Sequence, residues 1–361
     1  MDKVANKQMG QERDSPIKTF VVDDSPLMCR IMTKILSEDP QIEVLGHALS
    51  GKEALSFLSS NPCDLCTLDV HMPGMNGLTV LKHIMIKYPV PTLMVSAFTG
   101  DGSRVTFEAL RYGAVDFFQK PSQQGGQDLE AQGDLLRIKV KRAARVRLEA
   151  ARYLRLRPYS KASVEKHNDS IQSVVVIGTS TGGYAALLSL VPCLEKPPSA
   201  PVLISLGTQA CYIEAFTEYL KNYAPVMVKR AANQERLEPG TVYLIGEEEA
   251  AGLERDGTDV KLVLGKRADL SQNEGTIDLL LLSASELFGP GTLCIFLSGD
   301  GMKGITGAKE VLRNQGHVLV QRPQSCLAPE LPDRVMKELG AKAHPLSELC
   351  NQITDWRGDG P

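Results

Sequence analysis

Five polar residues in the first third of the chain stand at the ends of short apolar segments. They are Asp23, Asp24, Asp69, Ser96 and Lys120. Carboxylates that converge repel one another unless a hard divalent cation such as Mg²⁺ balances their charge. A lysine and a hydroxyl group beside such a metal are the groups needed to hold a phosphoryl group on one carboxylate. These residues therefore predict a Mg²⁺-dependent phosphorylation site.

A second candidate site is the segment Gly-Thr-Ser-Thr-Gly-Gly at residues 178–183, between an apolar run and an amphipathic one. A serine at a sharp turn from strand to helix is exposed, and the free N–H groups of the turn can bind a developing oxyanion. Ser180 is therefore a candidate nucleophile, with Thr181, Gly182 and Gly183 forming the turn. Two other roles fit the same segment, because the turn could bind a phosphate or Ser180 could cap the helix.

A serine nucleophile needs a general base, and the chain offers few histidines for that role. The six histidines stand at positions 47, 71, 83, 167, 317 and 344. His317 begins an apolar segment, so we expect it at the edge of the sheet opposite Ser180, and His344 falls in a loop. Lys303 is expected at the same edge as Ser180 and could act as the base once it has lost its proton. The acidic residues near Lys303 oppose that role because they favour its charged form.

Short apolar runs alternate with amphipathic stretches along the whole chain, which is typical of strands alternating with helices. Five such strands before residue 121 predict a five-stranded parallel sheet, and further strands from residue 174 predict a second, doubly wound α/β domain. In sheets of this kind ligands bind at the carboxyl ends of the strands, where both candidate sites fall. The predicted organisation is a polar arm (1–16), a first domain (17–133), a basic helix and linker (134–170), a second domain (171–353) and a tail (354–361) containing Trp356.

The composition is that of a globular protein whose partners are other proteins. The 40 Lys and Arg against 43 Asp and Glu give a net charge of −3, which does not indicate nucleic acid or an anionic membrane as a partner. No apolar stretch approaches the roughly 20 residues of a membrane span, so we expect no membrane insertion and a cytoplasmic location. The basic run at 135–157 could contact nucleic acid, but a solvated helix or one docked on an acidic neighbour explains it as well.

The strand-end motifs of the first domain resemble the response-regulator receiver domain, which has a flavodoxin-like fold. These motifs are Asp-Asp at 23–24, Leu-Asp-Val-His-Met-Pro-Gly-Met-Asn-Gly at 68–77, Val-Ser-Ala at 95–97 and Phe-Gln-Lys-Pro at 118–121. The resemblance implies that a histidine kinase supplies the phosphoryl group that Asp69 accepts. It also implies the roles of the other residues: Asp23, Asp24, Asp69 and the backbone carbonyl of His71 hold Mg²⁺, Ser96 and Phe118 form the switch, and Lys120 contacts the phosphoryl group.

The segment Ile-Gly-Thr-Ser-Thr-Gly-Gly at 177–183, downstream of such a receiver, resembles the catalytic domain of the chemotaxis protein-glutamate methylesterases, the CheB family. In that family the serine attacks the γ-methyl ester of receptor glutamates, a histidine is the base and an aspartate orients the histidine. Here Gly207 falls at the histidine position and Lys303 at the aspartate position. The resemblance therefore implies a methylesterase-like domain with a degenerate catalytic triad.

We therefore expect a two-component response regulator of chemotaxis, phosphorylated on Asp69, whose methylesterase-like output domain lacks normal esterase activity. Such a domain would act by binding a chemoreceptor or another signalling protein. The alternative is an active protein-glutamate methylesterase or glutaminase that uses Ser180, assisted by Lys303. The sequence leaves open whether the chain is an enzyme, and it does not indicate the oligomeric state.

Overall fold

The computed structural model describes residues 15–96, 100–121, 129–151, 154, 156, 171–208, 210–266, 275–301 and 303–358. Contacts within the chain divide it into two compact units. One comprises Met1–Ser96 and Phe118–Ala144, and the other comprises Ala97–Phe117 and Arg145–Pro361. Residues 1–14 of the expected polar arm, and residues 152–153, 155 and 157–170 of the expected basic helix and linker, lie outside the described residues.

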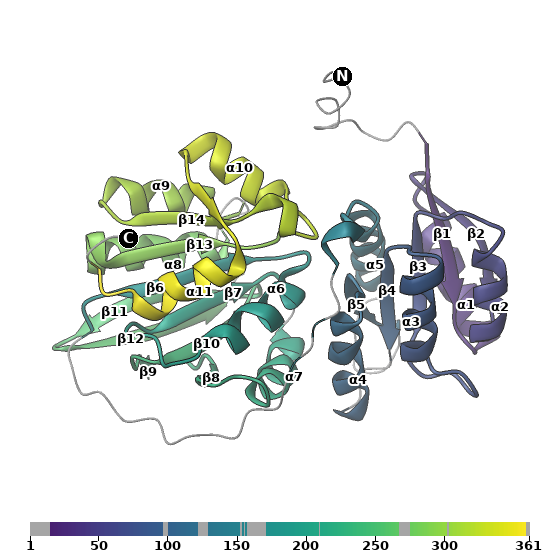
Figure 1. Ribbon diagram of the computed structural model, residues 1–361, viewed down its shortest axis with the longest axis horizontal. Helices are drawn as coiled ribbons and strands as arrows, with labels where there is room; N and C mark the ends of the chain where they lie inside the picture. Colours follow the sequence, from purple (N-terminus) through teal and green to yellow (C-terminus); the bar gives the residue numbers. More distant parts are fainter. Residues whose placement is uncertain are drawn as a thin grey trace. The chain divides into compact units, whose positions relative to one another are not determined.

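The first ten elements alternate strictly between strand and helix (Figure 1). They are β1 (Ile17–Val22), α1 (Pro26–Ser37), β2 (Ile42–Ala48), α2 (Gly51–Leu58), β3 (Leu65–Asp69), α3 (Gly77–Lys87), β4 (Thr92–Ser96), α4 (Gly100–Arg111), β5 (Asp116–Gln119) and α5 (Leu129–Ala143). The sheet has the strand order β2-β1-β3-β4-β5, and the pairs of β1 with β2, β1 with β3 and β3 with β4 are parallel. The five-stranded parallel sheet expected from the sequence is therefore confirmed.

Local sequence signals determine where helices beside this sheet begin. Ser25 caps α1 by accepting a hydrogen bond from the Met28 N–H, and Asn76 caps α3 in the same way. The basic α5 docks on the acidic end of α1, because Arg137 contacts Glu38 and Lys141 contacts Asp39. Basic residues at the start of the segment 134–170 therefore hold α5 against α1. This agrees with the interpretation of the basic run as a helix docked on an acidic neighbour.

The remaining elements form a larger sheet with its own helices and a hairpin. They are η1 (Leu148–Ala150), β6 (Val174–Thr179), α6 (Gly183–Leu190), η2 (Val191–Cys193), β7 (Val202–Leu206), α7 (Ala210–Lys221), β8 (Met227–Arg230), β9 (Glu235–Arg236), β10 (Thr241–Gly246), β11 (Glu249–Asp256), β12 (Asp259–Lys266), α8 (Thr276–Phe288), η4 (Gly289–Gly291), β13 (Thr292–Phe296), α9 (Ile305–Arg313), β14 (His317–Gln321), η5 (Pro323–Ser325), α10 (Glu330–Leu339), β15 (Lys342–His344) and α11 (Leu346–Asp355). Seven strands form a parallel sheet in the order β15-β14-β13-β6-β7-β10-β8. The antiparallel sheet β11-β12-β9 was not expected from the sequence.

Both parallel sheets contain a point at which the order of the strands reverses. In the first sheet the chain moves from β1 to β2 on one side and then returns to β3 on the other. In the second sheet β7 lies on one side of β6 and β13 lies on the other. The loops that leave the carboxyl ends of such strands diverge, which leaves a crevice where ligands bind.

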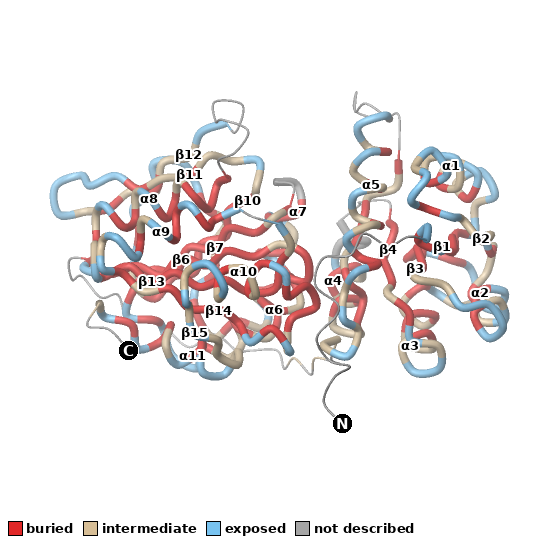
Figure 2. Tube along the Cα trace, turned by 90° about the horizontal axis from the view of Figure 1, so that it is seen from above, coloured by how far each residue is buried: buried red, intermediate tan, exposed pale blue. Residues whose placement is uncertain are grey.

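Buried residues follow the strands of both sheets, and exposed residues follow the outer faces of the helices (Figure 2). Trp356 in the expected tail is part of this buried set, with 3% of its surface exposed. Its ring nitrogen donates a hydrogen bond to the Gly291 carbonyl at 2.9 Å, and its ring packs against His317. The apolar ring and its single donor therefore both find partners in the second unit, so the expected tail is anchored at this residue.

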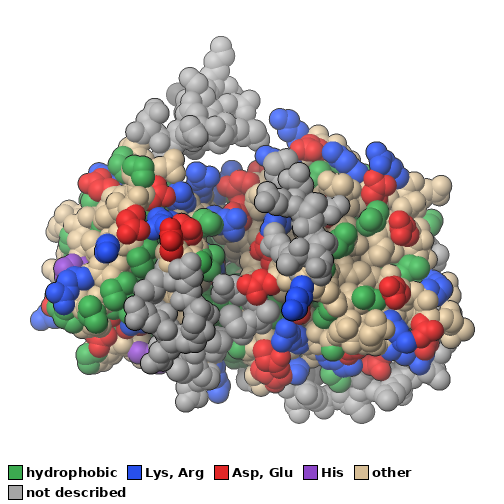
Figure 3. Space-filling model, turned by 180° about the vertical axis from the view of Figure 1, so that it is seen from behind, with side chains coloured by type: hydrophobic (Ala, Val, Ile, Leu, Met, Phe, Trp, Pro, Cys, Tyr) green, Lys and Arg blue, Asp and Glu red, His purple; other side chains and the backbone are tan. Residues whose placement is uncertain are grey.

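The surface agrees with a protein of nearly balanced charge. Lys and Arg side chains are interspersed with Asp and Glu over the face shown in Figure 3. Within the described part of the chain, none of the helices has the length and apolar character required to cross a bilayer.

Replacing Trp356 with alanine should destabilise the second unit, because the change removes a large buried ring and leaves the Gly291 carbonyl without its donor. We expect the free energy of unfolding to fall by about 3–5 kcal/mol, measured by urea denaturation followed by circular dichroism. Leu312→Ala is the control, because that side chain is 40% exposed. A loss for Trp356→Ala no larger than that of the control would contradict the packing described here.

Candidate functional site

The first candidate site lies at the reversal point of the five-stranded sheet. Asp23 and Asp24 directly follow β1, and Asp69 is the last residue of β3. One carboxylate oxygen from each of the three lies within 4.8 Å of the others. Lys120, which follows β5, places its ammonium group 2.7 Å from Asp23 Oδ2 and 3.0 Å from Asp69 Oδ2. The structure therefore brings together the four charged residues that the sequence singled out.

Burial gives this cluster unusual electrostatics. Burial raises the pKa of the Asp69 carboxyl, and its hydrogen bond to Lys120 offsets part of that effect. Burial also disfavours the charged form of Lys120, but its hydrogen bonds to Asp23 and Asp69 outweigh this, so the pKa of Lys120 is raised. Oδ1 of Asp69 is buried without a hydrogen-bond partner among the described residues. Three convergent carboxylates with an unsatisfied buried oxygen are a donor set that suits a hard divalent cation.

The other expected residues of this site also lie at the same edge of the sheet. Ser96 ends β4 and is buried, and its carbonyl accepts a hydrogen bond from the Lys120 N–H at 2.9 Å. Phe118 is buried in β5. His71 is exposed two residues after Asp69, which leaves its backbone close to the acidic cluster. The roles in phosphate binding and switching that the resemblance implied for these residues remain predictions.

The second candidate site is built where β6 and β13 end side by side. The Ser180 N–H and the Thr179 hydroxyl both donate to the Ser298 carbonyl, at 3.2 and 2.6 Å. Gly182 then adopts a φ of 78°, and a side chain there would meet Ser298 Oγ at 2.5 Å. A glycine is therefore required for the chain to turn this sharply into α6. The turn leaves Ser180 between the ends of the two strands.

The Ser180 hydroxyl contacts Asp300. Its Oγ donates to Asp300 Oδ1 at 3.1 Å and accepts from the Asp300 N–H at 3.0 Å. The Thr181 hydroxyl donates to the same Oδ1 at 2.6 Å. A role for Ser180 as the cap of the following helix is wrong, because Gly182 occupies the cap position and Ser180 Oγ is engaged elsewhere.

Gly207 lies directly beside Ser180. A Cβ atom built on Gly207 would come within 2.8 Å of Ser180 Cβ and 3.4 Å of Glu247 Oε2. The first distance is shorter than real contacts between carbon atoms, and Ser180 Cβ is held by the turn. The backbone at position 207 is therefore packed so closely against Ser180 that a side chain there requires the chain to shift.

Lys303 pairs with Glu247, whereas the sequence led us to expect that it acts on Ser180. Its ammonium group forms an ion pair with Glu247, which follows β10. An ammonium group beside a carboxylate is a poor base, because losing the proton would leave the carboxylate uncompensated. The ion pair therefore disfavours the prediction that Lys303 acts on Ser180 directly, and Asp300 is the residue that contacts the hydroxyl.

The histidines of the second unit lie away from Ser180, as the sequence predicted. His317 is the first residue of β14 and contacts Trp356, at the opposite end of the sheet from the Ser180 turn. His344 ends β15 and contacts Glu348. β15 is three strands from β6, which corresponds to about 14 Å at the usual strand spacing. His167 lies outside the described residues.

Asp278, in α8, organises the loop that carries Lys303. This buried carboxylate accepts hydrogen bonds from the N–H groups of Gly275, Gly304 and Gly307, at 3.2, 2.9 and 2.9 Å. Asp278 is not among the residues that the sequence singled out. An acidic residue at the start of a helical pattern was the available signal, because helix N-termini favour carboxylates.

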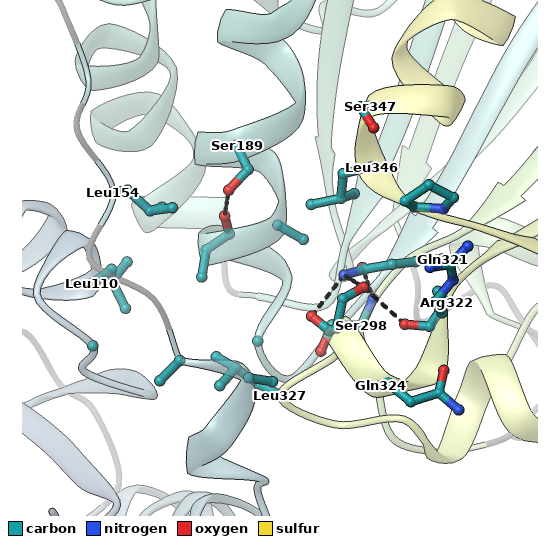
Figure 4. Close-up of a pocket in the computed structure, with 18 of the residues that line it drawn as sticks. Leu110, Leu154, Ser189, Ser298, Gln321, Arg322, Gln324, Leu327, Leu346 and Ser347 are labelled. Atoms are coloured by element: carbon teal, nitrogen blue, oxygen red, sulfur yellow. Dashed lines mark hydrogen bonds between the residues drawn. The ribbon is translucent and has the colours of Figure 1, made fainter.

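A cavity of about 580 Å³ opens beside α6 within the second unit, with Ser298, Gln321 and Arg322 among its lining (Figure 4). Gln321 is buried, accepts a hydrogen bond from the Ser298 N–H and donates to the Ser325 carbonyl, each at 3.0 Å. The buried polar groups of the cavity are thus paired with one another. Ser180 is not part of its lining.

Comparison with known proteins identifies both parts of the chain. The CheB methylesterase family model matches residues 175–353, and the response regulator receiver domain model matches residues 19–129. A protein-glutamate methylesterase/protein-glutamine glutaminase of Halalkalibacterium halodurans is 33% identical over 319 residues, 88% of this chain and 92% of that protein. The chain belongs to the CheB methylesterase family. A relative of the same name from Bacillus licheniformis is 34% identical over 335 residues, 89% of this chain and 92% of that protein.

The crystal structure of the Thermotoga maritima CheB methylesterase catalytic domain is 26% identical, covers 50% of this chain and 97% of its own, and has a TM-score of 0.48. Family membership confirms the resemblance drawn from the motifs and the fold of both domains. The names of the CheB relatives favour the hydrolase hypothesis over the hypothesis of a binding domain without activity. The assignment of Gly207 and Lys303 to the histidine and aspartate positions of the CheB family remains a prediction.

Replacing Gly207 with alanine should destabilise the second unit, because the added methyl group overlaps Ser180 Cβ. We expect the free energy of unfolding to fall by about 1–3 kcal/mol, measured by chemical denaturation. Gly265→Ala is the matched control, since a Cβ there would meet Ala250 at an ordinary 3.7 Å. Equal stability of the two variants would show that position 207 is not packed against the Ser180 turn.

Proposed function

We propose that this chain is a chemotaxis response regulator in which phosphorylation of Asp69 controls a protein-glutamate methylesterase/glutaminase activity at Ser180. The substrates would be γ-methyl glutamyl and glutaminyl side chains of chemoreceptors, and the phosphodonor would be a histidine kinase. The observation that carries the proposal is the position of Ser180 at a strand-to-helix turn, hydrogen-bonded to a carboxylate, in a chain that also has a complete receiver site.

The receiver residues support the input half of the proposal. Asp69 is the acceptor, and Asp23, Asp24, Asp69 and the backbone of His71 would hold Mg²⁺, which shields the charge of the incoming phosphoryl group. Lys120 already contacts Asp69 and is placed to contact a phosphoryl oxygen. The new charge favours an inward position of a donor such as Ser96, and Phe118 would follow that movement.

The output half is the hydrolysis of a γ-ester or γ-amide. Ser180 Oγ would attack the γ-carbonyl carbon, releasing methanol or ammonia and leaving a glutamyl ester on the serine. Water would then cleave that ester and leave a free glutamate. The N–H groups of Thr181 and Gly182 would stabilise the negative oxygen formed in each step, whereas the Gly183 N–H already donates to the Ser180 carbonyl at 2.8 Å.

A binding function without hydrolysis is the second candidate, and Gly207 favours it. Serine without an imidazole base is a poor nucleophile, and loss of a catalytic histidine costs on the order of 10⁶ in kcat in serine proteases. In this case phosphorylation would change the affinity of the output domain for a receptor. A measurement of hydrolysis separates the two candidates.

Asp69 should be the site of phosphorylation. Acetyl phosphate with Mg²⁺ should add one phosphoryl group to the wild-type chain, detected by intact-mass spectrometry, and none to Asp69→Asn. Chelation of the metal should abolish labelling, since the three carboxylates would then repel the donor. Glu43→Gln, on the exposed face of β2, is the control and should label normally. Equal labelling of Asp69→Asn would overturn the assignment.

Hydrolysis should depend on Ser180 and on phosphorylation. We expect the wild-type chain to release methanol from a methylated receptor fragment faster than Ser180→Ala does. Phosphorylation should raise this rate about 5–150-fold, which is the fold-change that typical coupling energies between two sites produce. Gas chromatography of methanol measures this directly. Release no faster than that of Ser180→Ala would reject the hydrolase and leave the binding function.

A further inference from the structure

We propose that Asp300 is the general base that activates Ser180, in the place of a histidine. This inference rests on the proposed hydrolase function and names the residue that accepts the proton. A general base must lie within hydrogen-bond reach of the proton that it removes. Asp300 Oδ1 meets this condition, at 3.1 Å from Ser180 Oγ.

The Asp300 carboxylate is held in place by a third group. Thr181 Oγ1 donates to Oδ1 at 2.6 Å, so the oxygen that faces Ser180 is fixed by a neighbour on the same turn. A nucleophile, a base and a group that orients the base form the arrangement expected of an activated serine. The Asp300 N–H also donates to Ser180 Oγ at 3.0 Å and would stabilise negative charge on that oxygen.

The loop that follows β13 and contains Gly299 and Asp300 brings these groups together. A Cβ on Gly299 would lie 2.8 Å from Ser180 Oγ, so only glycine leaves room for the hydroxyl. The Gly299 N–H donates to the Ala328 carbonyl, and the Gly299 carbonyl accepts from the Leu331 N–H. Asp300 therefore follows a residue that is anchored on both sides, which limits how far its carboxylate can move.

Lys303 and Glu247 are less well placed to act on Ser180. Lys303 forms an ion pair with Glu247, which makes its ammonium group a poor base. Glu247 lies beside Gly207, because a Cβ atom built on Gly207 would come within 3.4 Å of Glu247 Oε2. The same Cβ atom would face Ser180 Cβ and not the Ser180 hydroxyl. The hydroxyl of Ser180 is instead directed at Asp300.

The proton balance of the reaction is complete with Asp300 alone. As Ser180 Oγ forms a bond to the γ-carbonyl carbon, its proton passes to the Asp300 carboxylate. When the bond from carbon to the methoxy oxygen breaks, that proton passes to the leaving group and methanol departs. Water then repeats both transfers, so that Ser180 regains its proton and the product is a glutamate carboxyl.

The test uses the full-length chain and a fluorophosphonate probe, which reacts only with an activated serine. In this reaction the bond from Oγ to phosphorus forms, the bond from phosphorus to fluorine breaks, fluoride leaves and Asp300 takes the proton. We expect the wild type to be labelled on Ser180 and Asp300→Asn to be labelled about 10²–10⁴ times more slowly, the usual contribution of a general base. Thr181→Val, which keeps the carboxylate but removes its orienting hydrogen bond, should be slowed less.

The matched controls are Glu247→Gln and Lys303→Met, both of which should be labelled within about threefold of the wild-type rate. Normal phosphorylation of Asp69 and an unchanged melting temperature show that each variant is folded. If Ser180 is labelled and Asp300→Asn reacts at the wild-type rate, the inference is wrong while the hydrolase function stands. If the wild type is labelled no faster than Ser180→Ala, both are wrong.

Discussion

The reversal of strand order in each parallel sheet is the constraint on which both sites depend. In the first sheet it separates the loops after β1 and β3, which brings Asp23 and Asp69 together. In the second it separates the loops after β6 and β13, which places Ser180 against Asp300. The backbone groups of the strands are satisfied by the sheet, so the polar groups beyond their carboxyl ends remain available for a ligand. One architectural rule thus produces a cluster of carboxylates with a lysine and a serine turn in one chain.

The two sites solve the problem of buried charge in different ways. In the receiver, Lys120 lies between Asp23 and Asp69 and is kept charged by them, while burial raises the pKa of Asp69. That balance leaves the cluster short of positive charge, which favours binding of a divalent cation. At the second site the Asp300 carboxylate instead accepts hydrogen bonds from the hydroxyl groups of Ser180 and Thr181.

The sequence predicted the positions of those site residues that stand at the ends of strands. Strands alternating with helices place Asp23, Asp69 and Lys120 at one edge, and a glycine-rich turn marks Ser180, so these residues could be found from the pattern alone. The role of Asp300 could not, because it depends on the register that pairs Phe296 with Gly178 and on the path of a loop.

Two further misses have similar causes. Lys303 meets Glu247 through the ends of two strands that are far apart in the sequence, and no local pattern encodes that contact. The strand β11 (Glu249–Asp256) is half-exposed and rich in charge, so it lacks the apolar run by which strands such as β6 and β7 were predicted. In both cases the structure is determined by contacts between segments that are distant in the sequence.

The central claim is that Ser180 is a working nucleophile under the control of Asp69. The most direct measurement is intact-mass spectrometry of the chain after rapid mixing with an activated glutamyl ester, with and without prior phosphorylation. We expect a transient glutamyl adduct on Ser180 that forms faster in the phosphorylated chain. An adduct that is absent from the wild type, or that forms equally in Ser180→Ala, would contradict this claim.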